Sequence, residues 1–497
     1  MAAFVLKDFT GIDESQGTTN AQPNVAAAAH NISTDLGRLT VADGYALALP
    51  PVPGDEALRR VMRFDVRGET GTTTHVLVAT DTRVLVWLPG AEPWEAEEPD
   101  DTPRWHTLYD GALSGEWSYI VWEQLSRDII VLANGADPVK KWYGDTETLE
   151  DLEGLPTENE QTVRYKYLAL HKERLWGAGY PMAPDMVYYS QAFDPEKWGG
   201  DLLQPIAGGG VIPLPQHDGS SVAGLKTVFG DVLIFRTNNA IRIYGDNPDN
   251  YQIVTVRGAF GPIANESIVD AGTVCWFWTA DGLGYYDGMS TGLVDDRRIG
   301  SIVRRVNSAA YTRVNGIVKG NRLYMALPLD DAEQCTAMLE YDAGRQAYML
   351  HEGVAAQDFV FSDAARDTLY MAIGSAVCAM GGGTLGEAPI AAKWVSPWFD
   401  LDHKTSIKAI TRIETHGQLS KPNGGPNDMA AVTLTVQTEN GMAAKRFEMR
   451  NGREGRMGVS LLLAGTRFRV MVENVNGSLF ALDGGIALEV TEKRGAF

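Results

Sequence analysis

Cysteine is scarce in this chain of 497 residues. The three cysteines, Cys275, Cys335 and Cys378, lie far apart within apolar runs, and none stands at the spacing that is typical of a metal site. We therefore expect three buried free thiols. The sequence predicts neither a disulfide framework nor a metal ion bound through cysteine.

Long hydrophobic runs are also absent. No stretch approaches the ~18 apolar residues that a membrane-spanning helix needs. The first residues, Met1 to Phe4, lack a basic region followed by an apolar one, which a secretory signal would show. We expect a protein that is made and assembled in the cytoplasm and does not contact a membrane.

Basic residues are outnumbered by acidic ones. The chain has 43 Lys and Arg against 64 Asp and Glu, which gives a formal net charge of -21. Proteins that wrap nucleic acid need the opposite sign, because Lys and Arg neutralise its phosphates. The acidic balance either keeps an abundant protein soluble or lines a surface that DNA passes without specific binding.

Motifs of common enzyme classes are missing. The sequence has no Gly-x-Ser-x-Gly, no Gly-x-x-x-x-Gly-Lys-Ser/Thr and no His-Glu-x-x-His. Carboxylate pairs exist by number alone, and their spacing selects none of them. The turns at Asp281 and Asp287 lack the alternating acids of a calcium loop. The sequence therefore predicts a protein that is not an enzyme, with no catalytic, cofactor-binding or metal-binding residues.

A repeated pair of short strands dominates the middle of the chain. In its clearest copy, an apolar strand at residues 230–235 is followed by a turn and a second strand at 241–246, both rich in β-branched and aromatic residues. The other copies pair residues 76–79 with 84–87, 129–132 with 139–145, 175–178 with 186–189, 274–278 with 284–288, 323–327 with 338–342, and 369–373 with 377–380.

Successive copies begin about 49 residues apart, which matches the period of a four-stranded propeller blade. Flanking segments that can supply the remaining strands lie at residues 61–66, 222–228, 317–319 and 358–361. We predict an all-β fold with a β-propeller of about seven blades at residues 46–396. A stack of β-sandwiches with similar hairpins is the alternative.

The two ends differ from this repeat. Residues 1–45 are too short for a domain and predict an extended N-terminal arm. Its apolar residues Phe4, Leu6, Phe9 and Ile12 are candidate interface residues, which pack either on a neighbouring subunit or on the chain's own propeller. Residues 397–497 contain turns rich in Gly, Asn and Pro and predict a β-sandwich of the jelly-roll type. The longer alternating strands that we expect there lie at residues 407–415, 431–438, 445–449, 468–473, 479–482 and 486–490.

Several phrases resemble the tail-hub proteins of short-tailed bacteriophages, which are also called nozzle or packaged-DNA stabilisation proteins. The phrases lie at residues 173–179, 185–190, 194–198, 230–246 and 261–288. The opening of the chain is similar to theirs at residues 9–12, 31–32, 37–39 and 44–45.

The resemblance implies a structural protein of the virion tail, made in the host cytoplasm. Such a hub is a homo-oligomer of about six copies below a head-to-tail adaptor protein, with tail needle, spike or fibre proteins as further partners. It lines the conduit through which genomic DNA leaves and helps to retain the packaged genome. The resemblance implies no cofactor.

Two other functions remain open. One is a receptor-binding or glycan-degrading propeller of a tail fibre, and the other is a peripheral decoration protein of the virion.

Overall fold

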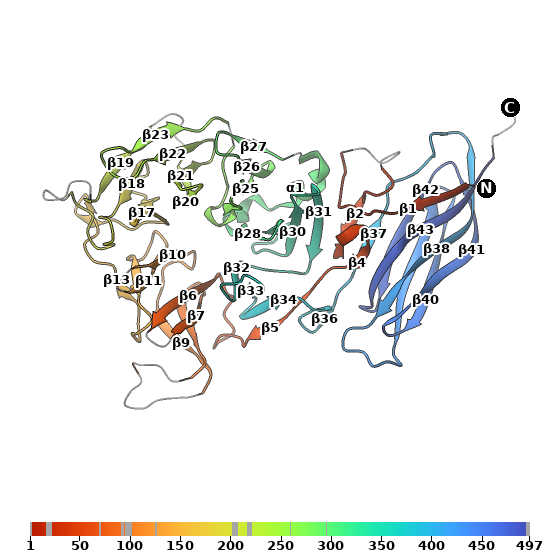
Figure 1. Cartoon of the computed structure of the whole chain (residues 1–497), viewed down its shortest axis with the longest axis horizontal. Coiled ribbons are helices and arrows are strands. Elements are labelled where there is room, and N and C mark those ends of the chain that lie inside the picture. The colour runs from red at the N-terminus through yellow and green to blue at the C-terminus, as the bar shows by residue number, and fades with distance from the viewer. Residues whose placement is uncertain are drawn as a thin grey trace.

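The computed structural model describes residues 2–15, 22–68, 71–90, 94, 102–124, 127–200, 207–215, 221–258, 260–294 and 296–493. Strands make up 54% of the chain and helices 5%, so the prediction of an all-β fold is confirmed. Figure 1 shows a ring of short strands on one side and a layered group of longer strands, formed mainly by the C-terminal residues, on the other. No helix among the described residues is long and apolar enough to cross a membrane.

The ring consists of consecutive sets of four antiparallel strands, seven within the described residues. The first three sets are β6 (Arg60–Gly68), β7 (Gly71–Ala79), β8 (Arg83–Leu88) and β9 (Arg104–Asp110); β10 (Ser118–Glu123), β11 (Asp128–Ala133), β12 (Lys140–Trp142) and β13 (Glu150–Asp151); and β16 (Tyr167–His171), β17 (Arg174–Ala178), β18 (Met186–Tyr189) and β19 (Gly210–Pro213).

The next two sets are β20 (Val222–Val228), β21 (Asp231–Arg236), β22 (Ala240–Tyr244) and β23 (Gln252–Thr255); and β24 (Val269–Asp270), β25 (Cys275–Thr279), β26 (Gly282–Tyr286) and β27 (Thr291–Leu293). The last two are β28 (Asn315–Lys319), β29 (Arg322–Leu327), β30 (Ala337–Asp342) and β31 (Ala347–Glu352); and β32 (Asp358–Phe361), β33 (Leu369–Ile373), β34 (Ala376–Met380) and β5 (Tyr45–Leu49).

The predicted hairpins are the second and third strands of these sets, and all seven pairings are confirmed. Second strands such as β11 and β17 are buried along their whole length, because neighbouring sets cover both of their faces. The predicted flanking segments form the first strands β6, β20, β28 and β32. First strands of neighbouring sets contact one another around the middle of the ring, as β6 does β32 and β16 does β20, so the fold is β-propeller-like.

Aromatic side chains fill the space between neighbouring sets. Phe64 of the first set lies 5.9 Å from Trp142 of the second, and Phe235 of the fourth lies 5.3 Å from Phe277 of the fifth, both measured between ring centroids. Such pairs contribute ~0.5–1.5 kcal/mol beyond the burial of their area. The sets are therefore held together by side-chain packing, and no ladder of backbone hydrogen bonds runs around the ring within the described residues.

The C-terminal residues form one further sheet and, through β2 (Ala28–His30), continue the sheet of the sixth set, and these strands share one core with that set. The further sheet contains β43 (Leu479–Lys493), β38 (Ile407–Ser420) and β41 (Arg453–Gly465), in that order. The continuation contains β37 (Lys393–Val395), β42 (Phe468–Val475), β39 (Met429–Thr438) and β40 (Gly441–Arg450). The predicted strands are present, except that two of them are parts of the single strand β43, and β41 was not predicted.

The N-terminal residues run through both parts of the molecule. The strand β1 (Ala2–Leu6) pairs with β43, as does β4 (Leu39–Val41), which in turn pairs with β3 (Ile32–Ser33). The strand β2 (Ala28–His30) lies between β31 of the ring and β37. The segment therefore ties the ring to the C-terminal sheets of the same chain.

The remaining elements are short. They are β14 (Thr157–Glu158), β15 (Gln161–Thr162), β35 (Thr384–Leu385), β36 (Ala388–Pro389), α1 (Gly300–Arg305) and the 3-10 helices η1 (Asp35–Gly37), η3 (Asn265–Ser267), η4 (Asp296–Arg298) and η5 (Ser308–Arg313).

Candidate functional site

Three charged side chains meet where the first strands of the ring converge. Arg60 begins β6, Asp358 begins β32 and Glu266 lies in η3, just before β24. Arg60 Nη1 lies 3.0 Å from Asp358 Oδ1, and Arg60 Nη2 lies 2.9 Å from Glu266 Oε2. The side chains of Arg60 and Asp358 are 7% and 9% exposed, so water hardly reaches this contact.

Further polar groups fix the two carboxylates. The Val61 backbone N–H donates to Asp358 Oδ2 at 2.9 Å, and Asn265 Nδ2 donates to Glu266 Oε1 at 2.7 Å. Lys226 Nζ lies 3.5 Å from Glu266 Oε2. Each carboxylate therefore has partners besides Arg60.

The short helix η3 holds Glu266 in place. Asn265 Oδ1 accepts a hydrogen bond from the Leu225 N–H of β20 at 3.0 Å, and Ser267 Oγ donates to the Ala264 carbonyl at 2.7 Å. Asn265 and Ser267 are buried. Because η3 is anchored on both sides of Glu266, the position of this carboxylate is set before any ligand binds.

The two carboxyl groups differ in acidity. Burial raises the pKa of Asp358 to about 6, although the nearby Arg60 charge opposes the shift. Burial also acts to raise the pKa of Glu266, but the charges of Arg60 and Lys226 outweigh it and lower the pKa to about 2. Between these values Asp358 is mainly protonated while Glu266 is ionised.

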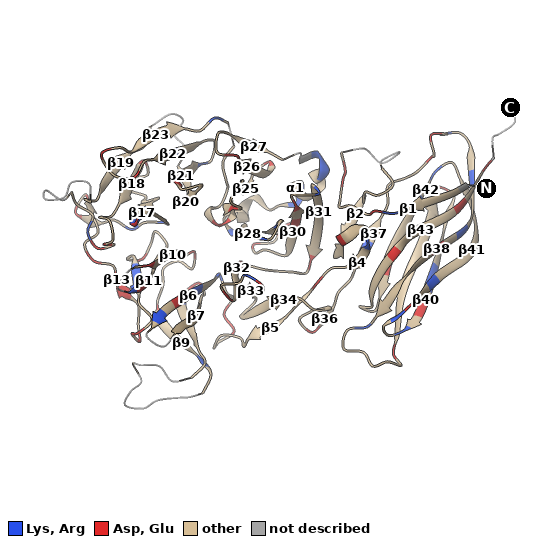
Figure 2. Cartoon of the chain, in the orientation of Figure 1, with Lys and Arg blue, Asp and Glu red and all other residues tan. Residues whose placement is uncertain are grey.

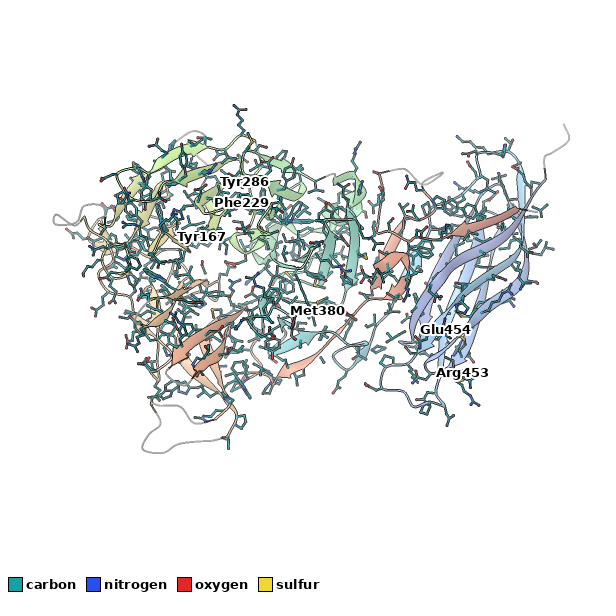
Figure 3. The ribbon with its side chains drawn as sticks, viewed as in Figure 1. Tyr167, Phe229, Tyr286, Met380, Arg453 and Glu454 are labelled. Carbon is teal, nitrogen blue, oxygen red and sulfur yellow. The ribbon has the colours of Figure 1, made fainter. Side chains whose placement is uncertain are left out.

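Two cavities meet at this cluster. The larger, of about 660 Å³, is lined by Arg60, Glu266 and Asp358, and also by Tyr119 and Lys226. Six acidic and four basic residues line it in all. The smaller, of about 70 Å³, shares Arg60 and Glu266 with the larger one and reaches Tyr167, which Figure 3 labels. Arg60 and Glu266 therefore border both cavities.

The arrangement offers the two groups that general acid–base chemistry requires. A carboxylic acid and a carboxylate face a cavity large enough for a sugar unit, and their pKa values are pushed apart by their surroundings. Because both bind one guanidinium group, their nearest oxygens lie no farther apart than the ~9.5 Å upper limit of glycosidase pairs. The same cluster also links three sets of the ring.

The four predicted interface residues lie elsewhere: Leu6, Phe9 and Ile12 are in the core of their own chain, and Phe4 is partly buried against it. Leu6 and Phe9 are fully buried and Ile12 is 5% exposed. Phe4 packs on Phe399 and Phe468 of the C-terminal sheets, with ring centroids 4.9 and 5.5 Å away. A contact of these side chains with another subunit stays a prediction. Residues 16–21 of the predicted arm lie outside the described residues.

The three cysteines are free and buried, as predicted. Burial raises the pKa of each of their thiols, which makes them poor nucleophiles and poor metal ligands.

Comparison with known proteins yields no matching family model and no matching curated protein. Among solved structures, an exo-β-1,3-galactanase variant from Phanerochaete chrysosporium with bound β-1,3-galactotriose is similar over 75% of this chain and 95% of its own, with 9% identity and a TM-score of 0.28. The same enzyme with galactose is similar over 77% of this chain and 98% of its own, with 6% identity and a TM-score of 0.26. These similarities concern the fold alone.

The comparison corrects one prediction. The chain was expected not to be an enzyme, whereas the solved structures that it resembles are glycoside hydrolases. The expectation rested on missing sequence motifs, but a glycosidase needs only two carboxyl groups at a suitable separation, and two such groups from distant strands leave no motif.

Sequence reasoning missed Arg60, Glu266 and Asp358 altogether. A usable signal was present, because Arg60 and Asp358 are charged residues that begin the apolar first strands of two repeats. The two residues are equivalent in the strand pairing, because Arg60 pairs with Ala79 and Asp358 with Ala372 at the same point of the two hairpins, but the turns after the first strands differ in length and hide this in the sequence.

Proposed function

We propose that the chain is a glycan-binding and glycan-hydrolysing β-propeller, in which Asp358 and Glu266 act on a sugar bound in the larger central cavity. The observation that carries this proposal is the pair of carboxyl groups with opposite pKa shifts, bridged by Arg60 at the mouth of that cavity. The proposal takes the four-stranded sets as seven blades of a propeller at residues 46–396, followed by a β-sandwich at 397–497.

The two carboxyl groups have different tasks in this scheme. Protonated Asp358 donates its proton to the glycosidic oxygen as the bond between that oxygen and the anomeric carbon breaks. Ionised Glu266 accepts a proton from the water whose oxygen adds to the anomeric carbon. Arg60 keeps both groups in place, and the opposite shifts set an activity maximum between pH about 2 and about 6.

The cavity favours a neutral glycan. With Asp358 protonated, its five other acidic residues still outnumber its four basic ones, so an acidic polysaccharide would be repelled. Tyr119 and Phe359 supply apolar surface on which a sugar ring can pack.

The test is a panel of neutral and acidic polysaccharides, with β-1,3-linked galactan among them, incubated with the full-length protein near pH 4.5. We expect new reducing ends from a neutral glycan, and their loss in Asp358→Asn and Glu266→Gln. Asp367→Asn, which changes an exposed acid on the loop after β32, is the matched control and should retain activity. Release of reducing ends by the Asp358 and Glu266 variants at the rate of the control would contradict the proposal.

A second candidate function is the ring-forming tail hub that the sequence phrases resemble. It is favoured by the uneven distribution of charge. Residues 1–396 contain 30 Lys and Arg against 53 Asp and Glu, whereas residues 397–497 contain 13 against 11. Figure 2 shows basic residues on β40 and β41, which end their sheets and have an unpaired edge within the described part of the chain.

Complementary charges of this kind suit a head-to-tail contact, in which the C-terminal sheets of one copy meet the acidic ring of the next. In that role the chain would sit in the virion tail between a head-to-tail adaptor and needle, spike or fibre proteins, around the path of the genomic DNA.

Sedimentation velocity at low and high salt tests this candidate. A closed oligomer of about six copies that dissociates as salt rises is the expected result, since screening weakens charge pairing. A monomer at every salt concentration and micromolar protein would contradict it.

A further inference from the structure

We infer that His416, Glu454 and Asp483 form a binding site for a divalent transition-metal ion, best suited to Zn²⁺, on the outer face of a C-terminal sheet. His416 Nδ1 lies 3.1 Å from Asp483 Oδ1 and 3.6 Å from Glu454 Oε1. The candidate ligand atoms of the three residues all lie within 4.8 Å of one another. All three side chains are exposed, so an ion can reach them from solvent.

The sheet order brings the three residues together. His416 belongs to the middle strand β38, Asp483 to β43 on one side and Glu454 to β41 on the other. In the register of β38 with β41, His416 faces Arg456 and Gln418 faces Glu454, so His416 and Glu454 are diagonal neighbours on one face. No local sequence motif results, because the three strands are far apart in the chain.

A bulge in β43 supplies the third ligand. Thr415 pairs with Ile486 and Gly417 with Leu482, so residues 483–485 face the single residue His416. Gly485 has a φ of +71°, and a Cβ on it would lie 2.5 Å from the Leu6 carbonyl oxygen, which requires glycine there. Bulges of this kind redirect side chains at functional sites, and this one is fixed by its contact with β1.

The ligand types select the metal. An imidazole nitrogen with two carboxylate oxygens suits Zn²⁺, which binds through four ligands and would take water as its fourth. Ca²⁺ and Mg²⁺ prefer sites made of oxygen alone. Arg456, which lies opposite His416 on β41, forms an ion pair with Glu414. The charge of Arg38 also acts on Asp483. Among the ion pairs of the described residues, those of Glu454 and Asp483 are with His416.

Calorimetric titration of the full-length protein with Zn²⁺ tests this inference. We expect one equivalent of Zn²⁺ to bind with micromolar or tighter affinity, together with a rise in Tm that Mg²⁺ does not produce. Both effects should be lost in His416→Ala and in Glu454→Gln, the latter on an edge strand where folding is least at risk.

His403→Ala is the matched control. His403 is also an exposed histidine of this region, but it pairs with a single carboxylate, that of Glu492, at 3.0 Å. Zn²⁺ binding should survive this change. Equal Zn²⁺ binding by the wild type and His416→Ala, or no binding by the wild type, would overturn the inference and leave the three residues as a simple ion-pair cluster. This result is independent of the glycan proposal, whose residues lie in the ring.

Discussion

Arg60 neutralises two carboxylates in the middle of the ring at the same time. Replacement by Met leaves Glu266 and the buried Asp358, whose side chain is 9% exposed, without their shared partner. Loss of one member of a buried ion pair costs ~3–5 kcal/mol of folding free energy. We expect a loss of that size in urea denaturation at pH 7.5, and a smaller loss below pH about 6, where Asp358 takes up a proton.

The neighbouring Arg59 provides the control. It binds Asp81, whose side chain is 59% exposed, so Arg59→Met should cost no more than ~1 kcal/mol. Equal losses for the two variants would show that the ring does not depend on the buried cluster.

Asp358 also makes stability depend on pH. Its folded pKa of about 6 lies above the ordinary value of 3.8, so its contribution to folding is fully present below pH 3.8 and is lost as pH rises through about 6. The difference amounts to roughly 3 kcal/mol. Glu266 acts in the opposite sense, because its stabilising effect is present above pH 4.5 and is lost as pH falls toward about 2.

Thermal unfolding from pH 3 to 8 measures the Asp358 effect. As pH rises from 4 to 7, ionisation of Asp358 should lower the Tm of the wild type. Asp358→Asn lacks this effect because its amide cannot ionise, so its Tm should rise relative to that of the wild type. The exposed Asp367→Asn should follow the wild type throughout. A constant difference between Asp358→Asn and the wild type would contradict the raised pKa.

At the scale of elements, β1 and the residues after it form part of the chain's own core. Phe9 is fully buried and packs edge-to-face on Trp394, with ring centroids 5.2 Å apart. Phe9→Ala should cost ~3–5 kcal/mol, the usual range for a buried phenylalanine. Val5 on the same segment is 40% exposed, and Val5→Ala should cost far less when both variants are compared by chemical denaturation. Similar losses would mean that the segment is not anchored as described.

The strands that sequence reasoning found and missed differ in their burial. The hairpins of the ring were predictable because strands such as β21, Asp231–Arg236, are apolar runs closed by short turns. The strand β41 was missed because it lies at a sheet edge, where much of it is exposed and carries Arg, Glu and Gly in place of an apolar alternation. Strand prediction was therefore least complete at the exposed sheet edges, where β41 was missed and β40 was predicted only at residues 445–449.

The candidate site could not be predicted for a related reason. Arg60, Glu266 and Asp358 are far apart in the chain. They meet because the first and last sets of the ring are neighbours in space, and because η3 of the fifth set lies against β20 and β28. The sequence repeat predicted the ring, but not which charged residues it would bring together. The pairing of β2 with β31 and β37, which joins the ring to the C-terminal sheets, likewise has no local signal.

On the scale of the whole molecule, the described residues form a ring with charged groups at its middle and a C-terminal extension of different charge (Figures 1 and 2). The extension contributes 13 basic residues of the total of 43. If this asymmetry drives self-association, reversal of the charges at Arg446, Arg450 and Arg453 on the β40–β41 edge to Glu should abolish the oligomer at low salt. Light scattering after size exclusion would show it, and an unchanged oligomer mass would exclude this edge from the contact.

The pH dependence of glycan cleavage tests the central claim most directly. Initial rates of reducing-end release by the wild type should rise above pH about 2, reach a maximum near pH 4 and fall as Asp358 loses its proton near pH 6. Asp358→Asn should lose most of the rate, and the rate that remains should no longer fall near pH 6. A rate that stays flat through pH 6, or the absence of cleavage at every pH, would contradict the assignment of the central carboxyl pair as a hydrolytic site.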